Sequence, residues 1–318
     1  MKFSITLFLL CTTLFLASCS KKKPAPIEIA INPWPGYEFL YLAEKKGFFE
    51  EAELNAKLLQ LGSLADVQRA YVSGFANGLA STLIEAVQAQ DLGGKPLEIV
   101  LVPDFSNGGD VIISRKEIKN ISELKGMTIG CEVSSLGIYM LQRALATSDL
   151  SLSDVNIINV EQRNGEDLIK NSQIDAFVSY PPSSVEILKD NKFHKIFSSA
   201  EIPKEVIDTI SISKEALAQN PNFVPKLHKV WQMALDYYKN FPEDAINIMA
   251  QREGISPEDF VATLSDLQLI DREGQKSIFN SRSTLQKSVI DVCHTLVEVD
   301  SFEGKCEQLP NLTYKGKI

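Results

Sequence analysis

Residues 27–49 read Ile-Glu-Ile-Ala-Ile-Asn-Pro-Trp-Pro-Gly-Tyr-Glu-Phe-Leu-Tyr-Leu-Ala-Glu-Lys-Lys-Gly-Phe-Phe, and this stretch decides the fold class. Its first five residues alternate as in a β-strand, whereas the apolar residues between Phe39 and Ala43 recur at helical spacing. A rigid aromatic loop, Trp34–Tyr37, therefore joins the carboxyl end of a strand to the start of a helix. In α/β folds ligands bind at such a position. The alternative is that Trp34 only packs under the sheet.

Strand and helix patterns alternate along the chain as far as residue 213, which predicts βαβ units and parallel sheets. Further strands are expected at 56–61, 78–80, 97–102, 110–114, 127–131, 155–160, 174–178, 195–197 and 208–213. Helices are expected at 64–72, 82–93, 137–146, 166–170 and 183–188, and from residue 214 onward the chain is expected to be almost all helical. A break at residues 104–109 divides the strands into two sets, which predicts two lobes.

The segment Ile31–Phe49 resembles the start of the periplasmic solute-binding proteins of nitrate, sulfonate, taurine and bicarbonate ABC importers, which share the domain of thiamine-pyrimidine precursor binders. The resemblance implies a type II periplasmic binding fold: α/β, with two lobes, each a mixed, mostly parallel sheet flanked by helices, and a two-segment hinge. Lobe 1 would comprise residues 27–110 plus 209–318, and lobe 2 would comprise residues 111–208. The segments 110–114 and 208–213 would lie antiparallel as the double hinge.

The net charge of the chain indicates which kinds of binding partner are expected. The 318 residues carry 32 Lys and Arg against 41 Asp and Glu, a formal net charge of −9. An acidic chain without a basic stripe argues against nucleic acid as a partner. It leaves an anionic small ligand open, because a binding site needs only a few local donors.

The amino terminus has the pattern of a processing signal. Lys2 precedes an apolar run, and residues 16–19, Leu-Ala-Ser-Cys, read as a bacterial lipobox. We expect residues 1–18 to be a lipoprotein signal peptide and residues 19–26 to be a lipidated Cys19 with its tether, carrying lipid such as palmitate. The protein would then be attached to a membrane on the periplasmic side of the cell envelope. The alternative is an ordinary secretory signal with a chance cysteine, and inner and outer membrane anchoring both remain open.

The remaining cysteines predict one disulfide. In the oxidising compartment that the leader implies, Cys293 and Cys306 would close a short loop near the carboxyl end, whereas Cys131 lies in a strand pattern and is expected to be a small core residue. No cysteine and histidine spacing indicates a metal site, so no metal and no cofactor are expected. The three scattered histidines give no support to a histidine-based catalytic centre, and we expect a protein that is not an enzyme.

Candidate ligand residues follow from the helix amino termini that face the expected cleft, because such termini offer free N–H groups and partial positive charge to anions. They are Trp34, Tyr37, Gly62, Ser63, Ser81, Thr82, Ser134, Ser135 and Gly137. Tyr180 is added because residues 175–182 resemble the strand of the related proteins that ends in a tyrosine, an acidic residue and a proline. The alternatives are that each serine or threonine only caps its helix and that Tyr180 is a packed aromatic. Pro181 stands where the related proteins carry an acidic residue, which lowers the expectation of a cationic or pyrimidine ligand. For Asp104 and Asp110, strand-end hydrogen bonding is weighed against ligand contact.

The resulting hypothesis is a lipid-anchored, monomeric component of an ABC importer that captures a small polar, anionic solute resembling nitrate, sulfonate or bicarbonate. Its partners would be the permease and ATPase of the importer. One alternative is a ligand-sensing periplasmic module that reports to a membrane signalling protein. Others are a binder of a thiamine-pyrimidine precursor and, less favoured, an enzyme that makes one.

Overall fold

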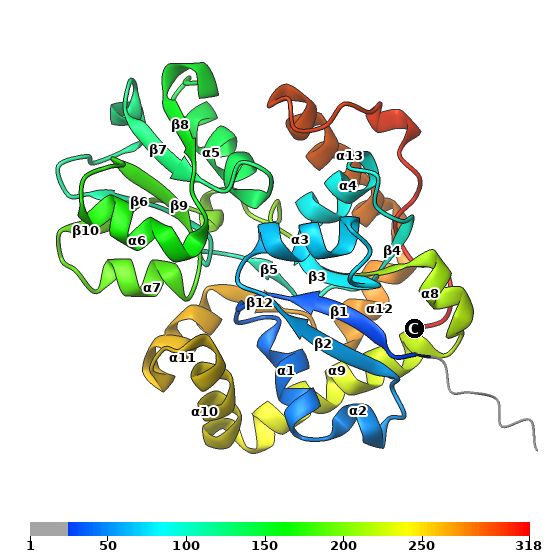
Figure 1. The fold of residues 1–318 in the computed structure, drawn as a ribbon. Helices are drawn as coiled ribbons and strands as arrows, with labels where there is room; N and C mark the ends of the chain where they lie inside the picture. Colours follow the sequence, from blue (N-terminus) through cyan, green and yellow to red (C-terminus); the bar gives the residue numbers. More distant parts are fainter. Residues whose placement is uncertain (1–24) are drawn as a thin grey trace, which may run out of the picture.

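Two lobes, each built on a five-stranded sheet, form the molecule (Figure 1). The computed structural model describes residues 25–318, so the expected signal peptide and the expected lipidation site at Cys19 lie outside the described residues. Among residues 25–318, no helix combines the length and the apolar character needed to cross a membrane.

The first sheet has the strand order β2-β1-β3-β11-β4. Its strands are β1 (Ile27–Ile31), β2 (Ala56–Gln60), β3 (Gly78–Thr82), β4 (Leu97–Leu101) and β11 (Asp208–Ser213). Strand β1 is parallel to β2 and β3, and β11 is antiparallel to both of its neighbours. Four strands therefore run in one direction and β11 runs against them.

The second sheet has the order β10-β6-β9-β7-β8. Its strands are β6 (Val111–Arg115), β7 (Thr128–Cys131), β8 (Asn156–Asn159), β9 (Ala176–Ser179) and β10 (Phe193–Ser198). Strand β6 is antiparallel to β9 and β10, while β7 is parallel to β8 and β9. Again one strand is reversed, so the expected mixed, mostly parallel sheets and the two-lobed α/β fold class are confirmed.

Helices surround both sheets (Figure 1). The lobe of the first sheet carries α1 (Glu38–Lys45), α2 (Phe48–Glu51), α3 (Leu64–Val72), α4 (Leu83–Asp91), α8 (Lys214–Gln219), α9 (Phe223–Asn240), α10 (Pro242–Glu253), α11 (Pro257–Ser265), α12 (Arg272–Asn280) and α13 (Arg282–Glu298). The other lobe carries α5 (Leu136–Ala146), α6 (Gln162–Lys170) and α7 (Ser183–Leu188). Short 3₁₀ turns are η1 (Ile121–Leu124), η2 (Leu152–Asp154), η3 (Ser199–Glu201) and η4 (Cys306–Gln308).

The two chain segments that connect the lobes lie side by side, but they are not the expected pair. Residues 110–114 belong to the second sheet and residues 208–213 to the first, so these two segments do not pair with each other. The contact is made just outside them: Phe105 bridges Ile207 in antiparallel fashion, and the Ser106 N–H donates to the Val206 carbonyl at 3.1 Å. The expected position of the hinge pairing was therefore wrong by several residues, because each reversed strand is drawn fully into its own sheet.

A short third sheet reinforces this connection. Strand β5 (Asp104–Ser106) pairs antiparallel with β12 (Leu267–Leu269), a strand within the otherwise helical carboxyl-terminal part. The Ser199 hydroxyl accepts the Gly108 N–H at 2.7 Å, which ties one connecting segment to the other. The connection is thus a hydrogen-bonded unit.

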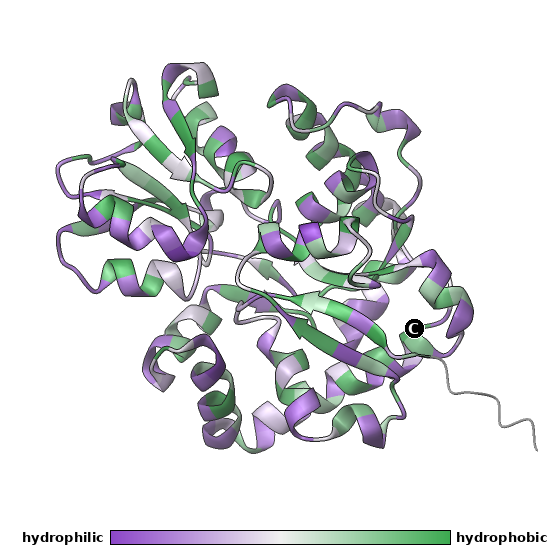
Figure 2. Ribbon diagram, viewed as in Figure 1, coloured by the Kyte–Doolittle hydropathy of each residue, from purple (hydrophilic) through white to green (hydrophobic). Residues whose placement is uncertain are grey.

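Burial of apolar residues stabilises the fold of each lobe. Strands of both sheets are largely hydrophobic, and the helices present mixed polar and apolar faces (Figure 2). The carboxyl-terminal part is tied to helix α13 because Cys293 and Cys306 form a disulfide, and Cys131 is a buried free cysteine.

Candidate functional site

A narrow cavity lies between the two lobes. Its empty volume is about 180 Å³, and no part of it is wide enough for a water molecule. Its lining comes from both lobes and consists of Asn32, Trp34, Tyr37, Leu64, Thr82, Asp110, Leu136, Tyr180 and Asp208. A solute therefore enters only when the lobes separate.

Three aromatic rings form one wall of the cavity. Trp34 and Tyr37 follow strand β1, and Tyr180 follows strand β9 of the other lobe. The Trp34 ring centroid lies 6.5 Å from that of Tyr37 and 6.3 Å from that of Tyr180, the latter in an edge-on arrangement. The loop before α1 can turn this tightly because Gly36 has no Cβ: a Cβ there would lie 1.8 Å from Asp104 Oδ2. The aromatic wall thus joins the lobes across the cleft.

Carboxyl groups form another part of the lining. Asp110 and Asp208 line the cavity directly, and each has a buried Oδ2 without a hydrogen-bond partner. Asp104 lies behind them, next to the Asp208 carboxyl group and the Trp34 indole N–H, and the Tyr37 hydroxyl donates to Asp208 Oδ1. Burial raises the pKa of Asp104 to about 7 and holds the pKa values of Asp110 and Asp208 well above the usual range of aspartate. The negative charge of nearby carboxylates raises those of Asp110 and Asp208 further.

Glu85 joins the lobes from the first turn of helix α4. Its Oε2 accepts the Thr82 hydroxyl at 2.5 Å, and its Oε1 accepts the backbone N–H of Leu136, at the start of α5, at 2.7 Å. Burial raises the pKa of Glu85 to about 7, although these hydrogen bonds partly oppose the shift. The free N–H of α5 that was expected to hold an anion is therefore already bound to a carboxyl group of the protein.

The amino terminus of α3 is used in the same way. The backbone N–H of Leu64 donates to the Tyr180 hydroxyl at 3.1 Å, and that hydroxyl donates to Glu132 Oε2 at 3.3 Å. Ser63 serves as the N-cap of α3, since its hydroxyl accepts the Asp66 N–H at 3.2 Å. In this closed form, both helix ends point at acceptors of the other lobe.

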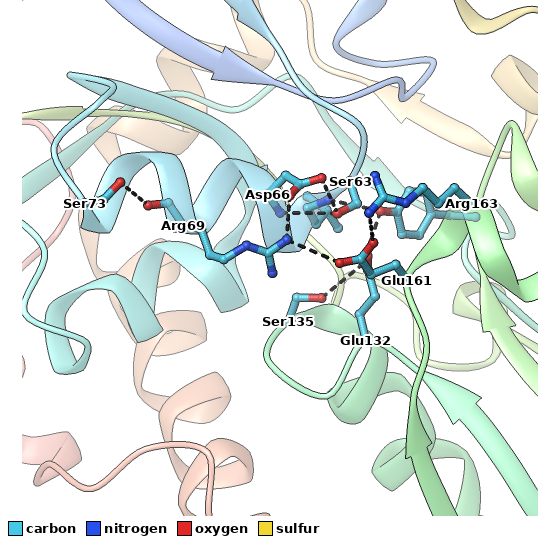
Figure 3. A network of polar contacts seen from close by, with 10 residues as sticks. Ser63, Asp66, Arg69, Ser73, Glu132, Ser135, Glu161 and Arg163 are labelled. Atoms are coloured by element: carbon cyan, nitrogen blue, oxygen red, sulfur yellow. Dashed lines mark hydrogen bonds and ion pairs between the residues drawn. The ribbon is translucent and has the colours of Figure 1, made fainter.

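Charged residues outside the cavity also meet across the gap between the lobes (Figure 3). The Arg69 guanidinium lies 2.5 Å from Asp66 on its own helix and 3.6 Å from Glu161 of the other lobe. Arg163 also pairs with Glu161, at 2.5 Å. These side chains are partly exposed, so each ion pair contributes little to stability. The contact between Arg69 and Glu161 nevertheless links one lobe to the other.

The ten predicted ligand residues divide into three groups. Four of them line the cavity: Trp34, Tyr37, Thr82 and Tyr180. Four more are buried beside it: Ser63, Ser81, Ser135 and Gly137. Two are exposed and do not line it: Gly62 and Ser134. Gly137 has a packing role, because a Cβ there would lie 2.7 Å from the Glu132 carbonyl oxygen.

The expectation of an anionic ligand stays a prediction, but the lining holds side chains on which that expectation did not rely. The residues that the expectation missed or set aside are acceptors: Asn32, Glu85, Asp104, Asp110, Glu132 and Asp208. The sequence held one signal, because Asp104, Asp110 and Asp208 all stand where a strand meets a connection between the lobes. The sequence analysis treated Asp104 and Asp110 mainly as turn and strand-end residues, so it did not predict that these three aspartates lie close together in the fold.

Comparisons with known proteins place the chain among binding-protein folds. A binding protein of Brucella abortus (strain 2308) is 28% identical over 154 residues, and the match spans 45% of this chain and 46% of that protein. The chain thus spans about half the length of the curated relatives it matches. The alkanesulfonate-binding protein SsuA from Xanthomonas axonopodis pv. citri bound to MOPS superimposes with a TM-score of 0.74 at 16% identity, over 89% of this chain and 96% of that one.

An enzyme shares the same architecture. The desulfurization enzyme DSZB superimposes with a TM-score of 0.63 at 14% identity, over 87% of this chain and 93% of that one. At these identities the likeness concerns the fold, which binding proteins and an enzyme have in common. The family model described as NMT1/THI5 like matches residues 34–245, well over half of the sequence, and the chain belongs to the NMT1/THI5-like family.

Proposed function

We propose that the protein is the extracytoplasmic solute-binding component of an ABC importer and that it is not an enzyme. The observation that carries the proposal is a cavity between two lobes whose lining comes from both and contains buried polar atoms without partners. Such atoms are costly to bury unless something satisfies them. A solute captured between the lobes would do so, and the resemblance of residues 31–49 to importer binding proteins favours delivery to a permease and ATPase.

Closure of the lobes would be the functional motion. We propose that residues 27–110 and 209–318 move as one lobe and residues 111–208 as the other. The paired connecting segments at Phe105 and Ile207 would act as the hinge. Because a ligand shifts an equilibrium only by its differential affinity, contacts from both lobes favour the closed form, which the permease would recognise.

The proposed location is the periplasmic side of the cell envelope. We propose attachment through lipid on Cys19, which rests on residues 16–19, Leu-Ala-Ser-Cys. Mass spectrometry of the protein purified from membranes should find a diacylglycerol adduct at Cys19. Release of an unmodified mature protein into the periplasmic fraction would contradict the anchor.

Four predicted residues remain the proposed ligand contacts: Trp34, Tyr37, Thr82 and Tyr180. The test is a thermal-shift screen of ligand-stripped protein against small solutes of every charge, followed by small-angle X-ray scattering. A bound solute should raise the melting temperature and make the molecule more compact. Absence of any binding solute from the screen would refute a solute-binding function.

Trp34→Ala is the variant to combine with this screen. Loss of a ring that contacts the solute should weaken binding by about tenfold or more, the usual effect of truncating a central aromatic contact. Phe75→Ala is the matched control, because Phe75 is an exposed aromatic residue away from the cavity. If Trp34→Ala binds the solute with unchanged affinity, the loop Trp34–Tyr37 has a structural role and does not contact the solute.

A further inference from the structure

We infer, on the basis of the proposed function, that the captured solute is a small organic cation bearing N–H groups, such as a primary ammonium, an amidinium or a guanidinium. This differs from the anionic solute that the helix termini favoured. The argument rests on which atoms of the cavity lack partners, on the charges around it and on the rings beside it.

The unpartnered atoms of the lining are mainly hydrogen-bond acceptors. They include Oδ2 of Asp110, Oδ2 of Asp208 and Oδ1 of Asn32, all on residues at most 2% exposed. Asn32 is uncharged and belongs to the loop after β1, so it is an observation separate from the carboxyl groups. The lining also holds one indole donor, the Trp34 N–H, which lies against the Asp104 carboxyl group and lowers its pKa. A solute that satisfies this lining must therefore donate hydrogen bonds.

Within residues 25–318, no basic side chain lines the cavity. The Arg252 guanidinium reaches the carbonyl of the lining residue Asn32 at 3.4 Å, but it is paired with the buried Glu38. Glu253 adds another buried carboxyl group beside that pair. The ionisable groups that face the cavity are thus acids, and an anion would be buried there without a positive charge to offset the loss of its hydration.

The aromatic wall fits the same class of solute. Trp34, Tyr37 and Tyr180 line one small volume, and aromatic rings attract cations that lie over their faces. Among the described residues, no group of three or more His, Cys, Asp or Glu side chains is placed to hold a metal ion. An organic cation therefore fits the site better than a metal.

Binding would be coupled to loss of protons. Without a counter-ion, buried carboxyl groups take up a proton, and burial raises the pKa of the Asp104 carboxyl to about 7. An arriving cation favours the ionised form, so each bound cation should release protons from this group of acids. A neutral or anionic solute has no reason to do so.

Isothermal titration at pH 7 tests the inference with ethylammonium, acetamidinium, guanidinium, tetramethylammonium, 4-aminopyrimidine, ethanesulfonate and nitrate. We expect the N–H cations to bind most tightly and tetramethylammonium, which has no N–H group, to bind more weakly. We expect no binding of the two anions. Titration of the tightest cation in buffers of different ionisation enthalpy should reveal proton release.

Asp208→Asn and Asp110→Asn are the diagnostic variants, since each removes one charge with little change of shape. Each should weaken cation binding at least about 30-fold, the lower end of the cost of losing one member of a buried charge pair. The exposed Asp167→Asn is the matched control and should bind like the parent protein. Both aspartate variants are used so that the test still holds if one of them fails to fold.

The outcomes separate the two proposals. Tight binding of ethanesulfonate, nitrate or the neutral pyrimidine, in preference to the cations, would overturn the inference and leave the solute-binding function standing. Cation binding that neither aspartate variant weakens would also overturn it. Absence of binding by every solute, here and in the wider screen, would overturn both.

Discussion

Glu85→Gln should change how stability depends on pH. Glu85 is buried between the lobes with no basic residue among its hydrogen-bond partners, and burial raises its pKa from 4.5 to about 7. Below pH 4.5 the carboxyl group is protonated in both the folded and the unfolded protein. Between pH 4.5 and pH 7 only the unfolded protein releases the proton, so stability falls as pH rises, and above pH 7 the loss is complete.

The magnitude follows from the size of this shift. A pKa that rises from 4.5 to about 7 corresponds to about 3 kcal/mol, at 1.36 kcal/mol per pKa unit. Glutamine never ionises, and its amide oxygen can still accept the Leu136 N–H. Relative to the parent protein, the variant should therefore gain about 3 kcal/mol in the free energy of unfolding between pH 4.5 and pH 8.

Urea denaturation at several pH values, followed by fluorescence, measures this difference. The exposed Glu117 lacks the burial on which the argument depends, so Glu117→Gln is the matched control and should follow the pH profile of the parent. A difference between Glu85→Gln and the parent that stays constant from pH 4.5 to pH 8 would refute the reasoning. It would mean that the carboxyl group is solvated and that the lobes are not closed upon it.

Three further substitutions test the packing around the cleft by urea denaturation. Gly36→Ala should cost about 1–3 kcal/mol through overcrowding against Asp104, and the cost should shrink when Asp104→Ala is added. Arg252→Met should cost about 3–5 kcal/mol because it leaves the buried Glu38 without its partner; a loss below 1 kcal/mol would show that the pair is solvated. Cys293→Ser opens a disulfide with a sequence separation of 13 residues and should cost about 3 kcal/mol, a loss that reduction of the parent protein should reproduce.

The strands were predictable because periodicity reports burial directly. Each strand expected from the sequence overlaps an observed strand, and the expected ends lie within two residues of the observed ends. The helix expected at 166–170 begins instead at Gln162, because the Gln162 side chain bonds to the Val178 carbonyl at 3.2 Å and to the Ser179 hydroxyl at 2.9 Å. Such tertiary support leaves no periodic signal in a segment of mostly polar residues.

Two short strands escaped prediction for a similar reason. Strands β5 and β12 each have three residues and form a two-stranded sheet, although their sequences are far apart. The break at residues 104–109 and the helical pattern after residue 214 concealed them. Short strands of this kind form because a distant partner is presented to them, which no local pattern records.

The anionic character expected of the ligand stays a prediction, because a helix amino terminus is an anion site only while its donors are free. The sequence located two such termini correctly, at Leu64 and Leu136, but it could not show where acceptors from the other lobe would be. In the folded chain the Tyr180 hydroxyl and the Glu85 carboxyl group occupy them. Each of these donors is satisfied by a contact between the lobes, and the aspartates of the cavity keep buried oxygens without a partner.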